Sequence, residues 1–279
     1  MPTRTPGRAL VMGVLNVTPD SFSDGGRYLE PAAAVARGRE MVAEGADVVD
    51  VGGESSRPGA APVEEAEELR RVLPVIEALA GEVRLSIDTV KPAVAEAAVG
   101  AGATIVNDIS GVLWPVAAAH GVGWVAMHMQ GRPADMQREP RYGDVVAEVS
   151  AFVLDAARTA RAGGVDEIWL DPGIGFGKTR AHNLALLAHL GPLVAAADAE
   201  GFSTMVGTSR KSFLAALGGP PRPPEPATAA TPPADRLEGS LATAVWAMSR
   251  GVGMVRVHDV APTVRAATLA GVMRDAVPA

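Results

Sequence analysis

Short runs of apolar, often β-branched residues alternate along the chain with longer stretches of helical period. Eight runs predict strands, at residues 9–15, 48–51, 84–87, 104–106, 123–127, 167–170, 204–206 and 254–257. The other stretches predict helices, at residues 31–44, 64–79, 92–99, 145–162, 183–197, 236–250 and 261–273. In the second helix Leu69, Val72, Ile76 and Leu79 recur at spacings of three and four, as one buried helix face requires.

Most of the predicted strands are apolar along their whole length rather than at every second position. Such strands are buried on both faces, and with helices between them they form a parallel sheet. Eight of them within 279 residues predict an α/β fold, a closed (β/α)8 TIM barrel that forms a single domain over residues 1–279. Between the fourth and fifth strands, residues 110–122 leave room for only a short helix.

One segment breaks the alternation: residues 218–234 read GGPPRPPEPATAATPPA. So much proline is incompatible with a helix or a central strand. The segment follows the seventh strand, and the one strand and two helices after it are too few to form a separate domain. We therefore expect an exposed, disordered loop inserted into the single domain rather than a linker between two.

Composition excludes several classes of function. The 25 Lys and Arg against 32 Asp and Glu give a formal net charge of −7, which argues against a nucleic-acid or anionic-membrane partner. The chain has no cysteine, so disulfides, thiolate metal sites and a cysteine nucleophile are excluded. No apolar run reaches the roughly 18 residues of a membrane span, and the first run fits a buried strand better than a signal peptide. We expect a cytoplasmic protein.

Polar residues stand where the predicted strands end. They are Asn16, Asp50, Asp88, Asn107, His128, Asp171, Ser209, Arg210, Lys211, Arg256 and His258. A single residue of this kind often only caps the next helix. In a (β/α)8 barrel, however, the carboxyl ends of all strands meet on one rim, where active sites lie. Their convergence predicts a site, although His128 alone fits a hydrogen-bonded core histidine better than a ligand contact.

Three loops on this rim add to the prediction. The loops MGVLNVTPDSFSDGG (12–26) and DVGGESSRPGA (50–60) are long and glycine-rich, as loops that close over a ligand are. VGTSRK (206–211) follows the seventh strand, where barrels often bind phosphate. Arg57, Lys211, Arg256 and His258 supply local positive charge, and the last two share one face of a strand. The acidic chain is thus expected to bind an anion locally.

Asp171 and Asn107 have the chemistry to recognise a flat, nitrogen-rich ring. A carboxylate accepts two parallel N–H bonds from a planar amino-heterocycle, and an amide donates and accepts at once. No His, Asp and Glu residues stand at the spacing of a zinc site. Any metal is therefore expected to be a labile Mg²⁺ on oxygen ligands and substrate phosphate.

Nine motifs follow one another along the chain. They are GVLNVTPDSFSDGG (13–26), DVGGESSRPGA (50–60), SIDT (86–89), NDISG (107–111), MHMQGRPADMQ (127–137), DPGIGFGK (171–178), TSRKSF (208–213), RLEGS (236–240) and RVHDV (256–260). In their order and spacing they closely resemble the motifs of the dihydropteroate synthases, the pterin-binding enzymes of the folate pathway that sulfonamides inhibit. The resemblance runs from Val11 to about Val260 and depends on all the motifs together, since DPGIG alone is a weak signal.

The resemblance implies that 6-hydroxymethyl-7,8-dihydropterin pyrophosphate condenses with p-aminobenzoate, by an SN1-like route, to dihydropteroate and pyrophosphate. The catalytic residues it implies are Asp88, Lys211, Arg256 and His258. The pterin slot it implies is formed by Asp88, Asn107, Met129, Asp171, Phe176, Gly207 and Lys211. For the diphosphate it implies Asn16, with Mg²⁺, and Arg256 and His258. For the p-aminobenzoate side and its closing loops it implies Phe22, Ser56, Arg57, Pro58, Phe176 and Ser209. Members of the family are commonly homodimers.

Three departures from the family pattern are visible. Ser56 stands where the family usually has threonine, and it keeps the hydroxyl. NDISG runs directly into VLWPVAAAHG, without the usual second glycine and acidic stretch, so the packing of the fourth loop is in question. The proline-rich insertion at 218–234 is not typical of the family.

Two other functions compete with this interpretation. A methyltetrahydrofolate-type methyltransferase shares a similar pterin slot, but it needs neither diphosphate anchors nor closing p-aminobenzoate loops. A catalytically silent paralogue that binds pterin should have lost some of these residues. Asn16, Arg57, Lys211, Arg256 and His258 are all present, which favours the synthase.

Overall fold

The structure is a computed structural model that describes residues 7–18, 30–55, 62–215 and 236–275. Four predicted site residues, Phe22, Ser56, Arg57 and Pro58, lie outside the described residues, as does the insertion at 218–234.

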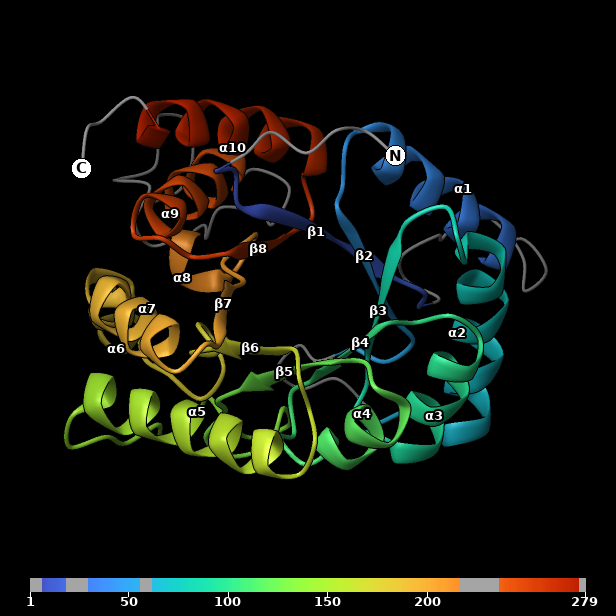
Figure 1. Ribbon diagram of the computed structural model, residues 1–279, viewed down its shortest axis with the longest axis horizontal. Helices are drawn as coiled ribbons and strands as arrows, with labels where there is room; N and C mark the ends of the chain where they lie inside the picture. The colour runs from blue at the N-terminus through green and yellow to red at the C-terminus, as the bar shows by residue number, and fades with distance from the viewer. Residues whose placement is uncertain (1–6, 19–29, 56–61, 216–235, 276–279) are drawn as a thin grey trace.

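Eight parallel strands form a closed barrel in chain order, with the last strand paired to the first. They are β1 (Leu10–Asn16), β2 (Val48–Gly52), β3 (Arg84–Asp88), β4 (Ile105–Asp108), β5 (Gly123–Met127), β6 (Ile168–Asp171), β7 (Ser203–Val206) and β8 (Met254–Val257). Helices surround the strands as an outer ring (Figure 1). The predicted (β/α)8 TIM barrel is confirmed.

The described helices follow the predicted order closely. They are α1 (Glu30–Ala43), α2 (Glu65–Leu79), α3 (Pro92–Gly100), α4 (Trp114–His120), α5 (Val145–Ala162), α6 (Arg180–Ala188), α7 (Leu190–Ala199), α8 (Ser212–Ala215), α9 (Leu237–Ser249) and α10 (Val260–Asp275). The α5 helix has the predicted bounds because Asp144 caps it, accepting bonds from the backbone N–H groups of Val146 and Ala147 at 3.0 Å. The short helix expected within 110–122 is α4.

The single helix predicted at 183–197 is wrong, because the structure has two helices there. Pro192 lacks a backbone N–H, and in a continuous helix its ring would collide with the carbonyl of Ala188, four residues earlier. The first helix ends at Ala188, and α7 begins at Leu190 with Pro192 in its first turn. The chain therefore changes direction where proline is tolerated.

The barrel interior explains where a site can form. A compact apolar cluster fills its lower part: Met12, Val48, Ile105, Val125, Trp169, Met205 and Met254. Alternate residues of a strand point to the same side, so the residues two positions further along also face the interior. Those residues are Val14, Asp50, Asn107, Met127, Asp171, Gly207 and Arg256. The layer above the apolar cluster is thus largely polar.

A larger apolar core lies between the strands and the surrounding helices and includes Leu15, Ile76, Leu79, Ile87 and Leu170. It holds the helices on the barrel and leaves the carboxyl ends of the strands to the loops. Among the described helices, none has both the length and the apolar character that a membrane crossing requires.

Candidate active site

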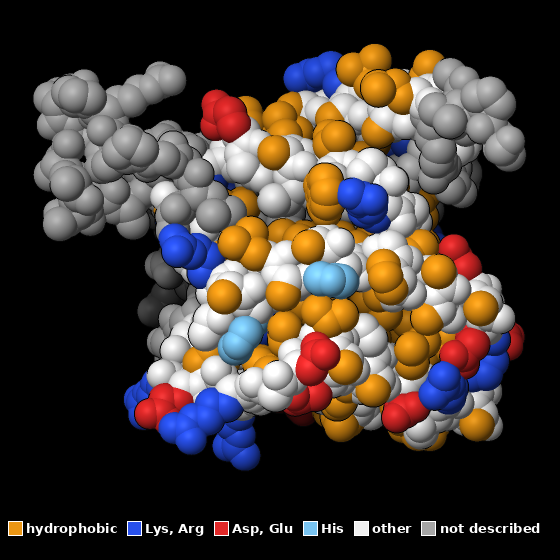
Figure 2. Space-filling view, turned by 90° about the vertical axis from the view of Figure 1, so that its left-hand side faces the viewer, with side chains coloured by type: hydrophobic (Ala, Val, Ile, Leu, Met, Phe, Trp, Pro, Cys, Tyr) orange, Lys and Arg blue, Asp and Glu red, His pale blue; other side chains and the backbone are white. Residues whose placement is uncertain are grey.

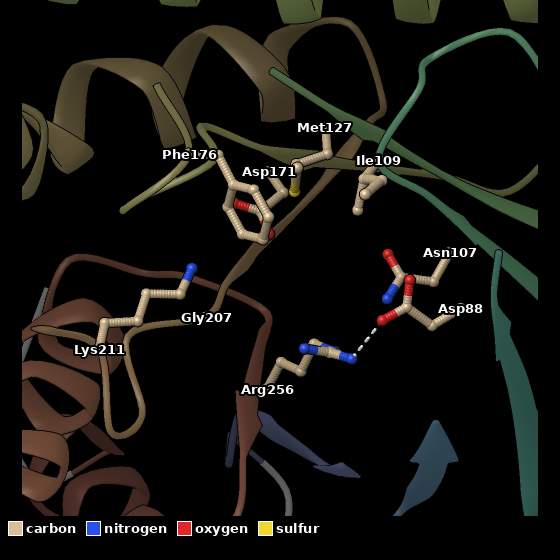
Figure 3. Close-up of a pocket in the computed structure, with 9 residues that line it drawn as sticks. All are labelled: Asp88, Asn107, Ile109, Met127, Asp171, Phe176, Gly207, Lys211 and Arg256. Carbon is tan, nitrogen blue, oxygen red and sulfur yellow. Dashed lines mark hydrogen bonds and ion pairs between the residues drawn. The ribbon is translucent and has the colours of Figure 1, made fainter. Parts of the chain in front are cut away.

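A cleft of about 290 Å³, including its open mouth, lies at the carboxyl ends of the strands (Figure 3). Its described lining is Asp88, Asn107, Ile109, Met127, Asp171, Phe176, Gly207, Lys211 and Arg256. Seven of these nine were predicted from the sequence. The exceptions are Ile109 and Met127, which add an apolar wall.

One side of the cleft is organised by the guanidinium of Arg256. Its Nη2 donates to Asp88 Oδ2 at 2.7 Å, and its Nε donates to Asp50 Oδ2 at 2.6 Å. The same Asp50 oxygen accepts a bond from Asn107 Nδ2 at 2.9 Å. Figure 3 shows Arg256 reaching across the cleft toward Asp88 and Asn107. A cation, two carboxylates and an amide are therefore joined in one network.

Burial dominates the electrostatics of this network. Burial raises the pKa of Asp88 to about 7, with the charge of Asp50 acting in the same direction and that of Arg256 opposing it. Burial by itself lowers the pKa of Arg256, but the carboxylates of Asp50 and Asp88 outweigh it, so the pKa is raised. Arg256 therefore stays charged, while Asp88 can change its protonation near neutral pH.

The opposite side of the cleft combines Asp171, Lys211 and Phe176. The Lys211 Nζ lies 4.5 Å from the centre of the Phe176 ring and donates to the backbone carbonyl of Ile174. Burial lowers the pKa of Lys211 to about 8, although Asp171 opposes the shift. Burial also raises the pKa of Asp171, against the charge of Lys211 and a 2.8 Å bond from the backbone N–H of Gly173. A carboxylate and an ammonium thus face one space.

The turn that follows Asp171 packs directly on the backbone after β5. A Cβ on Gly173 would lie 1.8 Å from the His128 carbonyl oxygen, and one on Gly177 would lie 2.2 Å from that of Gln130. Both glycines also have positive φ, at 65° and 59°. The glycines of the motif are therefore needed for close approach as well as for the turn.

Replacing Gly177 with alanine is expected to destabilise the fold strongly, by about 3 kcal/mol or more, because backbone atoms must move. Gly81→Ala is the matched control, since Gly81 also has positive φ but has open space around it. It should cost only about 1 kcal/mol. Urea unfolding of both variants measures the difference, and equal losses would show that the contact with Gln130 is unimportant.

Lys178 lies buried beneath this turn. Its Nζ lies 2.9 Å from His128 Nδ1 and donates to the carbonyls of Phe176 at 3.0 Å and His128 at 3.3 Å. Burial lowers the pKa of Lys178 to about 7 and that of His128 to about 4. The His128 ring also packs edge-on against Phe152, at 4.9 Å between centroids. His128 is thus a core histidine, as expected.

Of the predicted contact residues that the structure describes, four lie outside the lining of the cleft. Asn16 ends β1, close to Gly52 and Asp88. Ser209 Oγ accepts a bond from the backbone N–H of His258 at 3.1 Å and lies 3.1 Å from its ring Nδ1, so these two are joined. Met129 is half-buried on the loop after β5.

The shortened loop after Asn107 is well packed, which answers the question raised by its sequence. Asp108 is fully buried and accepts bonds from the backbone N–H groups of Ser110 at 2.8 Å and Leu113 at 2.6 Å. It also accepts a 3.2 Å bond from the indole N–H of Trp124. One carboxylate thus holds the loop and the start of α4.

Comparison with known proteins agrees with this geometry. A family model described as "Pterin binding enzyme" matches residues 12–258. A dihydropteroate synthase of Mycobacterium leprae is 46% identical over 281 residues, which cover 96% of this chain and 94% of the relative. The chain belongs to the pterin-binding enzymes, as a dihydropteroate synthase.

Solved structures support the same assignment for this synthase. A Xanthomonas albilineans dihydropteroate synthase with 4-aminobenzoic acid has a TM-score of 0.85 and 44% identity, covering 97% of this chain and 94% of that one. A Yersinia pestis enzyme in complex with a sulfonamide drug has a TM-score of 0.85 and 41% identity, covering 98% and 97%. These relatives are synthases rather than methyltransferases.

Two lining residues, Ile109 and Met127, were not singled out from the sequence of this synthase. The signal for Met127 was its place two residues after the buried Val125, which puts both side chains inside the barrel. Ile109 lies beyond the end of β4, where alternation gives no guide. A polar residue at the end of a predicted strand indicates a site, whereas an apolar residue that lines a cleft cannot be told from a core residue by its type.

Proposed function

We propose that this synthase condenses 6-hydroxymethyl-7,8-dihydropterin pyrophosphate with p-aminobenzoate in the cleft described above, giving 7,8-dihydropteroate and pyrophosphate. The observation that carries the proposal is the meeting of Asp88, Asn107 and Asp171 with the cations Lys211 and Arg256 around one buried space. The 4-aminobenzoic acid bound to the Xanthomonas albilineans relative supports the second substrate.

The acceptors of the cleft suit the pterin ring. Asp171 can accept two parallel N–H bonds from the amino and ring nitrogens, while Asp88 and Asn107 bind the opposite edge. The ammonium of Lys211 supplies a donor for the ring carbonyl, and Gly207 leaves room for the flat face. Ile109 and Met127 then pack against the ring.

Arg256 and His258 are the residues that we assign to the diphosphate. Arg256 uses two of its five N–H groups on Asp50 and Asp88, which leaves three for the phosphate oxygens. His258 follows β8 directly, two residues after Arg256. The donors are fixed before the substrate arrives, so they stabilise charge on the leaving group without reorganising.

The reaction then proceeds in two bond changes. The C–O bond between the pterin methylene and the diphosphate breaks, the electron pair leaves with the diphosphate, and Asp88 stabilises the resulting pterin-methyl cation. The neutral arylamine nitrogen forms the new C–N bond and afterwards loses a proton. No strong base is needed, and exclusion of water by the loops prevents hydrolysis of the cation.

Mg²⁺ is the cofactor that we propose. In the described part of the chain no three His, Asp or Glu side chains gather as a protein cage for a metal would. The amide oxygen of Asn16, at the end of β1, is a suitable single ligand, since Mg²⁺ usually keeps waters and takes its other oxygens from substrate phosphate. The ion would neutralise the negative charge that develops on the leaving diphosphate.

Removal of Mg²⁺ tests this proposal. EDTA should stop pyrophosphate release, and excess Mg²⁺ should restore it. Unchanged release in EDTA would refute the need for a metal ion.

For p-aminobenzoate we assign Phe176, which lines the cleft and has the Lys211 ammonium 4.5 Å from the centre of its ring. Ser209, held against His258, links this side to the diphosphate. The remaining predicted contacts fall outside the described residues, so their part in binding and closure stays a prediction.

The pH dependence of kcat/KM for the pterin diphosphate should be bell-shaped. Asp88 must be ionised and burial raises its pKa to about 7, so activity should rise through that pH. Lys211 must be charged and burial lowers its pKa to about 8, so activity should fall above it. Asp88→Asn should remove the acid limb, after correction for titration of the substrate. A flat profile from about pH 6 to about pH 9 would contradict both assignments.

The direct test mixes purified protein with the pterin diphosphate, p-aminobenzoate and Mg²⁺ and follows pyrophosphate and dihydropteroate. Equal amounts of both products are expected. Pyrophosphate without dihydropteroate would indicate a hydrolase, and no release from folded protein would refute the proposal.

We also propose a cytoplasmic homodimer, with each chain folded as a single domain. The side of α6, α7, α9 and α10 carries many hydrophobic side chains, and its charged side chains are densest in the lower part (Figure 2). Val245 and Trp246 on α9 and Leu269 and Val272 on α10 are exposed, the last two by 66% and 56%. Sedimentation velocity tests the dimer, and a monomer at micromolar concentration would refute it.

A further inference from the structure

Asp50 is a fully buried carboxylate on β2 that does not line the cleft. Its Oδ2 accepts the bonds from Asn107 Nδ2, at 2.9 Å, and from Arg256 Nε, at 2.6 Å. In the barrel β2 stands two strands from β4 and two strands from β8, so Asp50 lies between the strands that carry these two partners. One oxygen atom of Asp50 therefore bonds to a side chain from β4 and to a side chain from β8.

All the side-chain bonds of Asp50 to described residues go to these two cleft residues. Its second oxygen, Oδ1, is buried without a partner among the described residues, and so is Oγ of Ser86, which pairs with Asp50 in register. Burying a carboxylate costs free energy, and an apolar residue would suit the inside of a barrel better. Packing alone does not account for a carboxylate at this position.

Asp108 shows what a structural carboxylate looks like in the same barrel. It too is fully buried, but it accepts bonds from backbone N–H groups of the loop before α4, from the hydroxyl of Ser110 in that loop and from the indole of Trp124. Asp108 holds the chain, whereas Asp50 holds side chains that face the ligand. The two residues therefore form a matched pair for an experiment.

The contacts of Asp50 decide how its partners face the cleft. Because Nδ2 of Asn107 points to Asp50, the amide cannot turn over, and its Oδ1 is presented to an N–H donor of the ligand. The guanidinium of Arg256 is held at Nε by Asp50 and at Nη2 by Asp88, which fixes its plane. Without Asp50, both groups could rotate.

We propose that Asp50 is a positioning residue for both halves of the site, orienting the amide of Asn107 toward the pterin and the guanidinium of Arg256 toward the diphosphate. The proposal rests on the proposed function for the identity of the ligands. A positioning role can be told apart from a role in folding. If Asp50 positions both groups, a change at this one residue should weaken the binding of the pterin and the binding of the diphosphate together.

The test compares Asp50→Asn with Asp108→Asn. Calorimetry measures the Kd of 6-hydroxymethylpterin without diphosphate and, separately, of inorganic pyrophosphate with Mg²⁺, and steady-state kinetics give KM for p-aminobenzoate. For Asp50→Asn we expect both Kd values to rise by about tenfold to a hundredfold, as loss of a bond to a charged group predicts. The KM for p-aminobenzoate should change by less than about threefold, since Asp50 has no contact on that side.

Asp108→Asn should lower the Tm but leave both Kd values nearly unchanged. Asn107→Ala should weaken only the pterin and Arg256→Gln mainly the pyrophosphate, so Asp50→Asn is expected to be the variant that weakens both. Unchanged Kd values for Asp50→Asn, or weakening of only one ligand, would overturn the proposal. So would an equal effect of Asp108→Asn. If the unaltered protein binds neither ligand, it is the proposed function that has failed.

A second pair of variants covers the case in which Asp50→Asn does not fold. Asp50→Asn combined with Arg256→Gln removes one carboxylate together with the cation. The buried carboxyl that remains is Asp88, which takes up a proton readily because burial raises its pKa to about 7. The double variant's Kd for 6-hydroxymethylpterin should exceed that of Arg256→Gln alone by about tenfold, because the acceptor that holds Asn107 has lost its charge. Equal values would overturn the positioning of Asn107.

Discussion

Arg256→Ala should lower kcat/KM for the pterin diphosphate by about a thousandfold, the upper range for loss of one donor to a developing anion. The substitution removes the only cation bonded to Asp50 and Asp88 among the described residues and leaves two buried carboxylates without their shared counter-charge. Without that charge, Asp88 should take up a proton more readily, so the activity that remains should require higher pH.

Binding measurements show which part of the substrate loses its contact in Arg256→Ala. The Kd of the pterin diphosphate should rise far more than that of the pterin lacking diphosphate. Arg84→Ala is the control, because Arg84 also lies on a barrel strand and pairs with Glu167, but at the amino end. It should leave the kinetics unchanged. If both ligands weaken equally, the assignment of Arg256 to the diphosphate is wrong.

Asp171→Asn should raise the Kd of the pterin by about a hundredfold to a thousandfold. The amide would turn an N–H donor toward a ring edge that also donates, and the charge of the acceptor is lost. Calorimetry with 6-hydroxymethylpterin measures the change, with Asp155→Asn as the control because Asp155 is exposed on α5. A Kd within about twofold of the unaltered protein would remove Asp171 from the pterin site.

The same substitution should not destabilise the fold at pH 7. Burial raises the pKa of Asp171 above its unfolded value, so ionised Asp171 costs stability that increases as pH rises from the unfolded pKa to the folded pKa. Removing the charge removes that cost. Urea unfolding should therefore show Asp171→Asn to be at least as stable as the unaltered protein, which separates lost binding from lost folding.

Most of the fold could be predicted from the sequence, because buried parallel strands are apolar on both faces and are therefore easy to recognise as continuous apolar runs. The strand at Gly123–Met127 and the helix at Val145–Ala162 have the predicted bounds. Asp88, Asn107 and Asp171 were visible as polar residues that end apolar runs. The break at Pro192 was missed because the apolar period continues through it.

The network around Asp50 could not be derived in the same way. Its partners are 57 and 206 residues away in the sequence, and the bonds depend on how far side chains reach across a closed barrel. Alternation places Asp50 inside the barrel but does not say which neighbours it touches. Register and side-chain direction, which only the folded chain provides, decide that a strand-end carboxylate serves other residues rather than the ligand.

The barrel closes between β1 and β8, which affects the order in which the site is completed during synthesis. Residues 10–13 of β1 pair with 254–257 of β8, so the first and last strands of the chain meet. Arg256 lies on that last strand and is synthesised after about nine-tenths of the chain. A chain that still lacks β8 can neither close the barrel nor give Asp50 and Asp88 their counter-charge. Closure of the barrel and completion of the cleft therefore depend on the same strand.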